Sequence, residues 1–188
     1  MPSLASRVTV LLLMAVACNR PPAANAPAEN PVARGAYLAN VGGCNDCHTP
    51  KIFSATSMGL DTTRLLAGYP AGSKVPTLPA GLPNAAGWAA LSNADGTAWA
   101  GPWGTSFAAN LTPHETGLAA WTPEQFIQTM RTGKHMGTGR AVLPPMPWQD
   151  YGQMTDDDLR AVFAYLRSLK PVANAVPAPV GTTSSPRP

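Results

Sequence analysis

Two cysteines and a histidine lie together in the segment Cys44-Asn45-Asp46-Cys47-His48. Two thiols at this spacing, followed directly by an imidazole, form the attachment site of a c-type haem. Each thiol can form a thioether to one haem vinyl group, and the adjacent histidine then lies under the ring, where it can bind iron. The spacing therefore predicts one covalent haem c, attached through Cys44 and Cys47, with His48 as an axial ligand of the iron.

Two other kinds of site use cysteines at this spacing. A thioredoxin-like redox pair would lie between a strand and a helix, whereas residues 49–51 indicate a loop after the motif. A structural zinc site needs four ligands, usually in two separated pairs. The only other cysteine, Cys18, lies in a leader, and His114 and His135 stand alone in the sequence. We therefore favour haem attachment over both alternatives.

The second axial position of an electron carrier is also filled, and a methionine opposite the histidine raises the reduction potential. Met146 is the favoured ligand because residues 143–148 contain three prolines and form a stiff loop that can present a thioether. Met136 and His135 remain as alternatives. Other methionines are expected near the haem motif, on an apolar helix face and before a helix cap, and these are Met58, Met130 and Met154, respectively.

Three segments carry the start and stop signals of helices. They are residues 32–41 after Asn30 and Pro31, a segment from Thr122 and Pro123 to Gly133, and a segment from Thr155 to Lys170. The first delivers the haem motif, and Gly35 within it is either incidental or allows another helix to approach closely. In the third, apolar residues recur at i, i+3, i+4 and i+7, which indicates a face turned toward a core.

The N-terminus has the features of an export signal. Residues 1–17 contain one basic residue and an apolar run that is too short to span a bilayer. The last residues of this segment, with Cys18, are similar to the lipobox of bacterial lipoproteins, which predicts a lipid on that cysteine. Ordinary signal cleavage, which would leave Cys18 as a free terminal thiol, is the alternative.

The remaining chain divides by composition. We expect a flexible tether over residues 18–30, one domain over 31–171 and a disordered tail over 172–188, because both flanks are rich in proline and small residues. The formal charge is +3, but without Arg7 and Arg187 the thirteen basic residues fall to eleven against ten acidic ones. Two haem propionates would make the sum slightly negative, so charge gives no indication of nucleic-acid binding.

The central segment, residues 50–121, is rich in proline, glycine, alanine and tryptophan, and no helix or strand period persists in it. A structureless segment of this length is unusual in a compact domain. A haem would supply the apolar surface on which such a segment could pack, and the segment is expected to cover one haem edge. The aromatic residues expected to make this contact are Trp88, Trp99, Trp103 and Phe107.

Several motifs of the chain resemble those of class I c-type cytochromes. They are Ala33-Arg34-Gly35-Ala36-Tyr37-Leu38, the haem motif with Thr49-Pro50, Pro144-Pro145-Met146-Pro147-Trp148 and Tyr165-Leu166-Arg167-Ser168-Leu169. Asn110-Leu111-Thr112-Pro113, Glu115-Thr116-Gly117 and Trp121-Thr122 are further similar to haem domains in cytochrome subunits of membrane-bound alcohol and aldehyde dehydrogenases. The resemblance implies an all-α fold whose first and last helices cross near Gly35 and Tyr165, with His48 and Met146 on the iron.

These features together predict a function in electron transfer. We expect a non-enzymatic one-electron carrier with a single haem c, exported to the periplasmic or cell-surface side and anchored to a bacterial membrane by a lipid on Cys18. Its partners would be a redox donor and a redox acceptor, with no substrate bound at the iron. The alternative is a haem enzyme or gas sensor with an open or labile sixth position on the iron. Candidate propionate partners by residue type are Arg64, Arg140 and Trp148.

Overall fold

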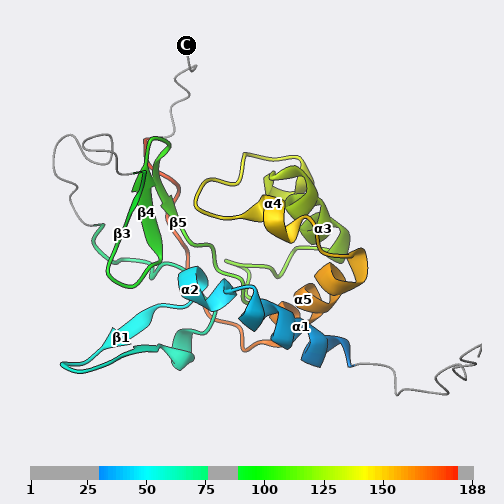
Figure 1. Ribbon diagram of the computed structural model, residues 1–188, viewed down its shortest axis with the longest axis horizontal. Coiled ribbons are helices and arrows are strands. Elements are labelled where there is room, and N and C mark those ends of the chain that lie inside the picture. Colours follow the sequence, from blue (N-terminus) through cyan, green and yellow to red (C-terminus); the bar gives the residue numbers. More distant parts are fainter. Residues whose placement is uncertain (1–29, 76–88, 182–188) are drawn as a thin grey trace, which may run out of the picture.

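The computed structural model describes residues 30–75 and 89–181. Within these ranges the helices are α1 (Pro31–Val41), α2 (Cys44–His48), α3 (Pro123–Thr132), α4 (Trp148–Tyr151) and α5 (Asp156–Ser168), with short 3-10 helices at Thr62–Arg64 and His135–Gly137. The strands are β1 (Lys51–Phe53), β2 (Met58–Leu60), β3 (Leu91–Ser92), β4 (Ala98–Gly101) and β5 (Gly104–Phe107). Figure 1 shows the sheets on one side of the molecule and most of the helices on the other.

The expectation of an all-α fold is wrong. The central segment forms two antiparallel sheets, one of β1 and β2 and one in the order β3-β4-β5. Each strand is only two to four residues long. Strands of this length are shorter than the runs from which a two-residue period can be recognised, and their glycines weaken the strand signal further. The domain therefore combines α-helices with small β-sheets.

The three helices expected from the sequence are confirmed, together with their caps. The Asn30 side chain accepts a hydrogen bond of 2.9 Å from the backbone N–H of Val32. Thr122 and Gln125 form a reciprocal capping box at the start of α3, with bonds of 3.2 and 3.0 Å. Thr155 accepts a bond of 3.1 Å at the start of α5. The helices α2 and α4 are too short for periodicity to reveal them.

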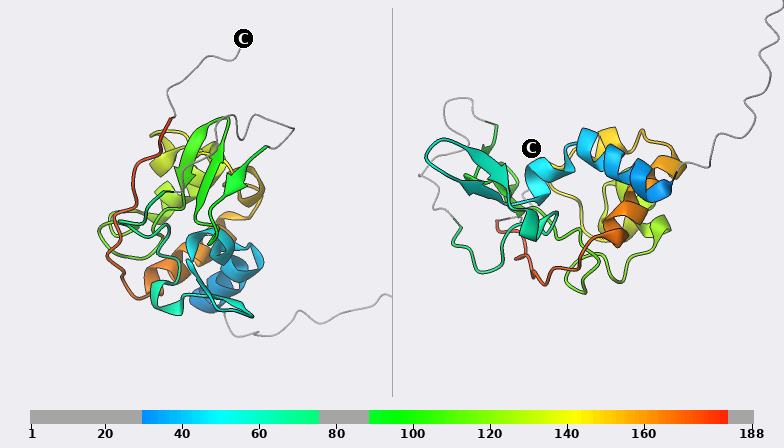
Figure 2. Two further views of the ribbon diagram at one scale, coloured as in Figure 1. Left: turned by 90° about the vertical axis from the view of Figure 1, so that its left-hand side faces the viewer. Right: turned by 90° about the horizontal axis from the view of Figure 1, so that it is seen from below.

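Helices α1 and α5 cross and pack closely (Figure 2). Gly35 is buried at the crossing, and a Cβ atom there would collide with the backbone of Ala161 and lie 2.9 Å from Cβ of Tyr165. An ion pair of 2.9 Å between Arg34 and Asp158 links the same two helices. The close approach that Gly35 permits is therefore real. The buried apolar core beside it consists of Leu66, Leu118, Phe126, Ile127, Met130, Leu159, Val162, Phe163 and Leu166.

The segment after α5 differs from the expected disordered tail. Residues 172–180 run back from α5 toward the three-stranded sheet (Figure 2), and the side chain of Asn174 is buried with 2% exposure. At the far end, Val180 forms an antiparallel bridge with Thr105 of β5. The predicted leader, Cys18, Trp88 and residues 182–188 lie outside the described residues.

Replacing Gly35 by alanine tests the helix crossing. We expect Gly35→Ala to lower the free energy of unfolding by about 3 kcal/mol, because the added methyl group would force α1 and α5 apart. Gly59→Ala is the matched control, since a Cβ at Gly59 meets no atom within 4 Å and should change stability by less than about 0.5 kcal/mol. Chemical denaturation of both purified variants measures the difference, and equal stabilities would contradict the assigned contact.

Candidate haem site

His48 is held in a defined orientation by a backbone carbonyl. It ends the short helix α2, is 9% exposed, and its Nδ1 lies 2.8 Å from the carbonyl oxygen of Ala109. Because a carbonyl can only accept, Nδ1 carries the proton and Nε2 keeps its lone pair. Burial lowers the pKa of His48, which favours the neutral ring. Metal-binding histidines have this tautomer and commonly donate their other ring N–H to a backbone carbonyl in the same way.

The carbonyl of Ala109 is placed by close backbone packing. Gly68 has a φ of 79°, and a Cβ there would collide with the carbonyl groups of Ala108 and Ala109. The N–H of Gly68 donates to the carbonyl oxygen of His48 at 2.7 Å, and the N–H of Tyr69 donates to that of Ala108 at 2.9 Å. A turn near Gly68 therefore joins the backbone of the haem motif to the segment that orients its histidine.

His48 lies in the wall of a large cavity. The volume of the cavity is about 660 Å³, within the range of small-molecule and cofactor sites. Cys44 and Cys47 lie in the same wall, one helical turn apart, and Met146 lines the cavity from the proline-rich loop. Apolar side chains from α3 and α5 complete the lining, including Phe126, Leu159, Val162 and Leu166.

The two cysteines are free thiols rather than a disulfide. Burial is the main cause that raises the pKa of Cys44 to about 11, and burial also raises the pKa of Cys47. A redox-active cysteine pair instead depends on a lowered thiol pKa. The surroundings of the pair therefore do not favour the thioredoxin-like alternative.

The cavity brings some of the candidate axial ligands together and excludes others. Met130, Met146 and Met154 line it, and His135 lines it beside Trp121, with their ring centroids 4.9 Å apart. The remaining candidates do not line it. Met58 is exposed on β2, Met136 lies in the 3-10 helix His135–Gly137, and His114 bonds to Thr116 at 2.9 Å. Three thioethers therefore compete for a position opposite His48.

Some of the aromatic and basic residues expected near the haem line the cavity, and others do not. Trp99, Phe107, Arg140 and Trp148 line the cavity. Two others do not: Trp103 donates from Nε1 to Ser106 Oγ at 3.2 Å, and Arg64 donates from Nη2 to Asn174 Oδ1 at 3.1 Å.

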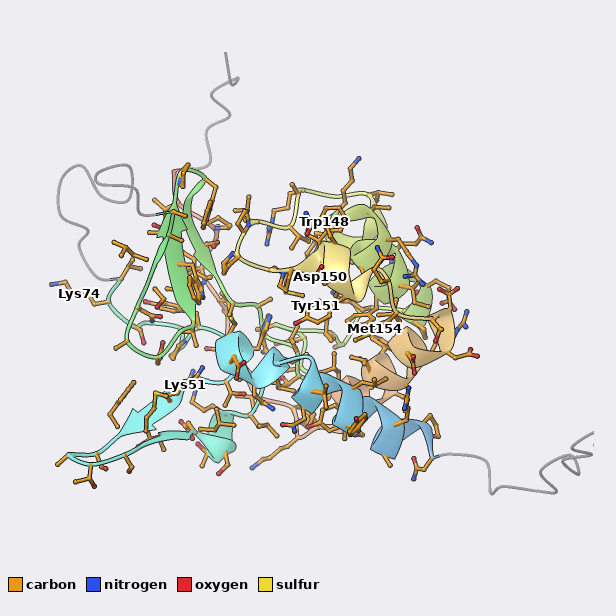
Figure 3. All side chains as sticks on the ribbon, in the orientation of Figure 1. Lys51, Lys74, Trp148, Asp150, Tyr151 and Met154 are labelled. Carbon is orange, nitrogen blue, oxygen red and sulfur yellow. The ribbon has the colours of Figure 1, made fainter. Side chains whose placement is uncertain are left out.

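Sequence reasoning missed Tyr151 and Ala109. The hydroxyl of Tyr151 donates to the carbonyl oxygen of Gly42 at 2.5 Å, which links α4 to the end of α1. Tyr151 also lines the cavity. Figure 3 labels Tyr151 together with Trp148 and Asp150 of the same helix. Burial is the largest cause that raises the pKa of Tyr151 to about 12. Ala109 acts through its backbone, so the type of its side chain gives no signal.

These residues fit a covalent haem. The cavity is of suitable size and largely apolar, two thiols lie in its wall, and Nε2 of His48 has no hydrogen-bond partner among the described residues. Histidine and methionine are established axial ligands of haem iron. Among the residues that the structure describes, no group of three or more histidine, cysteine, aspartate or glutamate side chains is placed to hold a metal ion by itself.

Comparison with known proteins also supports a haem-binding domain. No protein-family model matches the chain. It is 29% identical over 175 residues to the fructose dehydrogenase cytochrome subunit of Gluconobacter japonicus, which covers 90% of this chain and 28% of that protein. The chain is similar to dehydrogenase cytochrome c subunits.

Two further relatives of this kind show how much of each protein is shared. The gluconate 2-dehydrogenase cytochrome c subunit of Pantoea cypripedii is 29% identical, over 77% of this chain and 24% of the relative. The cytochrome c subunit of the quinone-dependent alcohol dehydrogenase of Gluconobacter oxydans is 38% identical, over 42% of this chain and 16% of the relative. The chain thus spans about a quarter of the length of the cytochrome subunits it matches most extensively.

Proposed function

We propose that this protein is a single-haem c-type cytochrome that carries one electron at a time between redox proteins of a dehydrogenase or respiratory chain. The observation that carries the proposal is His48, buried in the cavity wall beside Cys44 and Cys47 with its Nδ1 bound to a backbone carbonyl. The similarity to cytochrome subunits of fructose, gluconate and alcohol dehydrogenases supports the same chemistry.

Each residue of the site has a separate task in this proposal. Cys44 and Cys47 would hold the haem in place through two thioether bonds to its vinyl groups. His48 would hold the iron through Nε2, and Met146 would supply the second protein ligand through its thioether sulfur. The bound haem supplies a ferric–ferrous couple. The apolar walls exclude water and so set the reduction potential together with the axial ligands.

Met146 is the proposed ligand among the three methionines because its loop is fixed to the sheet. Ser106 of β5 donates from Oγ to the carbonyl oxygen of Pro144 at 2.6 Å, two residues before Met146. Met130 is instead a buried core residue of α3 with 9% exposure. Met154 lies directly before the cap of α5, and its carbonyl accepts a bond of 2.8 Å from Arg131. Met146 thus combines a rigid support with a place in the cavity wall.

Replacing Met146 by alanine tests the ligand assignment. We expect the reduction potential of Met146→Ala to fall substantially and the reduced protein to bind carbon monoxide, because the iron loses its sixth ligand. Met130→Ala is the matched control: it should keep its axial ligands and lose about 2 to 5 kcal/mol of stability, as expected for a truncated core residue. An unchanged potential in Met146→Ala would rule out this ligand.

The same optical experiment on the unmodified protein separates an electron carrier from the alternative function. A reduced spectrum that does not change with carbon monoxide indicates an iron with both axial positions filled. Rapid binding indicates an open site, as a haem enzyme or gas sensor would have. In that case His135, which also lines the cavity, would be the candidate acid–base group.

Single substitutions of the two cysteines test the covalent attachment. Cys44→Ser and Cys47→Ser should each keep one thioether, which shifts the alkaline pyridine spectrum toward that of a haem with one free vinyl group. The double variant should release its haem on a denaturing gel. Haem that stays attached in the double variant would contradict attachment at these residues.

We also place the protein outside the cytoplasm, with a lipid on Cys18 and residues 18–30 as a tether. The sequence of residues 1–18 supports this location. In the described ranges, the structure contains no helix that is long and apolar enough to cross a bilayer. The domain itself would then stand on the periplasmic or cell-surface side and reach its redox donor and acceptor by movement of the tether.

Substitution of Cys18 tests the anchor. Cys18→Ala should move the haem-loaded protein from the membrane fraction to the soluble fraction, because the acyl chains would be lost. The wild-type protein should carry a mass increase from acylation at its first mature residue. If the wild-type protein is fully soluble and its mature chain begins with an unmodified Cys18, ordinary signal cleavage is favoured.

A further inference from the structure

The segment after α5 forms part of the cavity wall. Residues 172–180, here called the strap, run from the end of α5 to the three-stranded sheet, and the stretch from Ala175 to Pro179 lines the cavity. This stretch has no regular secondary structure, so its position depends on contacts at its two ends. Those contacts therefore hold this part of the cavity wall in place.

At the near end, the strap is fixed by Asn174. Its side-chain amide donates to the carbonyl oxygens of Ala67 and Tyr69 at 2.6 and 2.9 Å, and its Oδ1 accepts from the N–H of Ala71 and from Arg64 at 2.7 and 3.1 Å. Two donors and two acceptor sites are all that an asparagine side chain offers. With 2% exposure, Asn174 is therefore a fully satisfied buried polar residue.

The same part of the strap is hydrogen-bonded to the segment whose backbone carbonyl orients His48. Asn110, which follows the residue whose carbonyl orients His48, donates from Nδ2 to the carbonyl oxygen of Val172 at 2.9 Å. The N–H of Asn174 donates to Thr116 Oγ1 at 3.0 Å, and that hydroxyl also accepts from Asn110 Nδ2 at 3.0 Å. Asn110 and Asn174 thus connect the strap to the support of the histidine.

At the far end, the strap pairs with the edge of β5. Thr105 and Val180 exchange two backbone hydrogen bonds, of 2.8 and 2.9 Å. Gly104, with a φ of 93°, allows this approach, because a Cβ there would collide with the carbonyl oxygen of Val180. The side chain of Val180 is itself 60% exposed, so the far end is held mainly through its backbone.

We propose that Asn174 is a positioning residue of the haem pocket: it holds the strap against the cavity and so limits the access of water and small ligands to the iron. The inference rests on the proposed function for the identity of the bound group. Ferric haem carries one more positive charge than ferrous haem, so water admitted to the pocket stabilises the ferric state. Loss of the strap therefore lowers the reduction potential.

The test uses the haem-loaded, full-length protein and two variants. Asn174→Ala removes the four side-chain bonds, and Val180→Pro removes only the N–H that donates to Thr105 at the far end. Both variants should have a lower reduction potential than the wild type. Both should also bind azide at the ferric iron faster, by about tenfold in Asn174→Ala, which corresponds to the loss of one well-satisfied buried polar group.

Asn93→Ala is the matched control. Asn93 accepts two backbone hydrogen bonds of 2.9 Å in the turn between β3 and β4, and it does not line the cavity. This variant should lose stability while its potential and azide-binding rate stay at wild-type values. Equal shifts in Asn93→Ala and Asn174→Ala would overturn the proposal, because they would reflect general destabilisation.

The outcomes separate the two proposals. The spectrum and carbon monoxide response of the wild type decide the proposed function before any strap variant is compared. Wild-type potential and azide rate in both folded strap variants would overturn the role of Asn174. If Asn174→Ala fails to fold, Val180→Pro decides whether the strap limits access to the iron, because the Val180 side chain is exposed and wild-type values in this variant would overturn that role of the strap.

Discussion

The hydrogen bond between Nδ1 of His48 and the carbonyl oxygen of Ala109 is the contact on which the site depends. It selects the tautomer that leaves Nε2 available and fixes the plane of the ring. A backbone carbonyl can do this only if its own segment is rigid. The turn at Gly68 packs against that segment on one side, and Asn110 ties it to the strap on the other. The irregular segments around Gly68 and Asn110 thus support a single histidine.

The sequence allowed a reliable prediction wherever local physical chemistry decides the structure. Capping side chains at Asn30, Thr122 and Thr155 define helix starts within a few residues, so α1, α3 and α5 were correct. The strands were missed because each is held by pairing partners rather than by its own pattern. The strap was missed for a related reason, since Asn174 lies in a composition typical of disorder and its hydrogen-bond partners are about sixty to one hundred and ten residues away.

In the candidate site, too, local features could be predicted from the sequence and features that depend on distant contacts could not. The spacing of Cys44, Cys47 and His48 was sufficient to propose haem attachment, because the chemistry lies within five consecutive residues. The second ligand could only be ranked, because the fold brings Met130, Met146 and Met154 to the same cavity. What distinguishes Met146 is the bond from Ser106 to its loop, and no sequence pattern reports a contact between residues thirty-eight positions apart.

The cavity and the hydrophobic core share most of their residues. Of the nine buried residues in the core cluster, six also line the cavity, namely Leu118, Phe126, Met130, Leu159, Val162 and Leu166. These side chains belong both to the core and to the cavity wall, so an apolar group that fills the cavity would add to the burial that drives folding. A bound haem would therefore contribute to the stability of the fold as well as to its electron transfer. With such a group bound, short strands, a small core and an irregular strap would together close a shell around it.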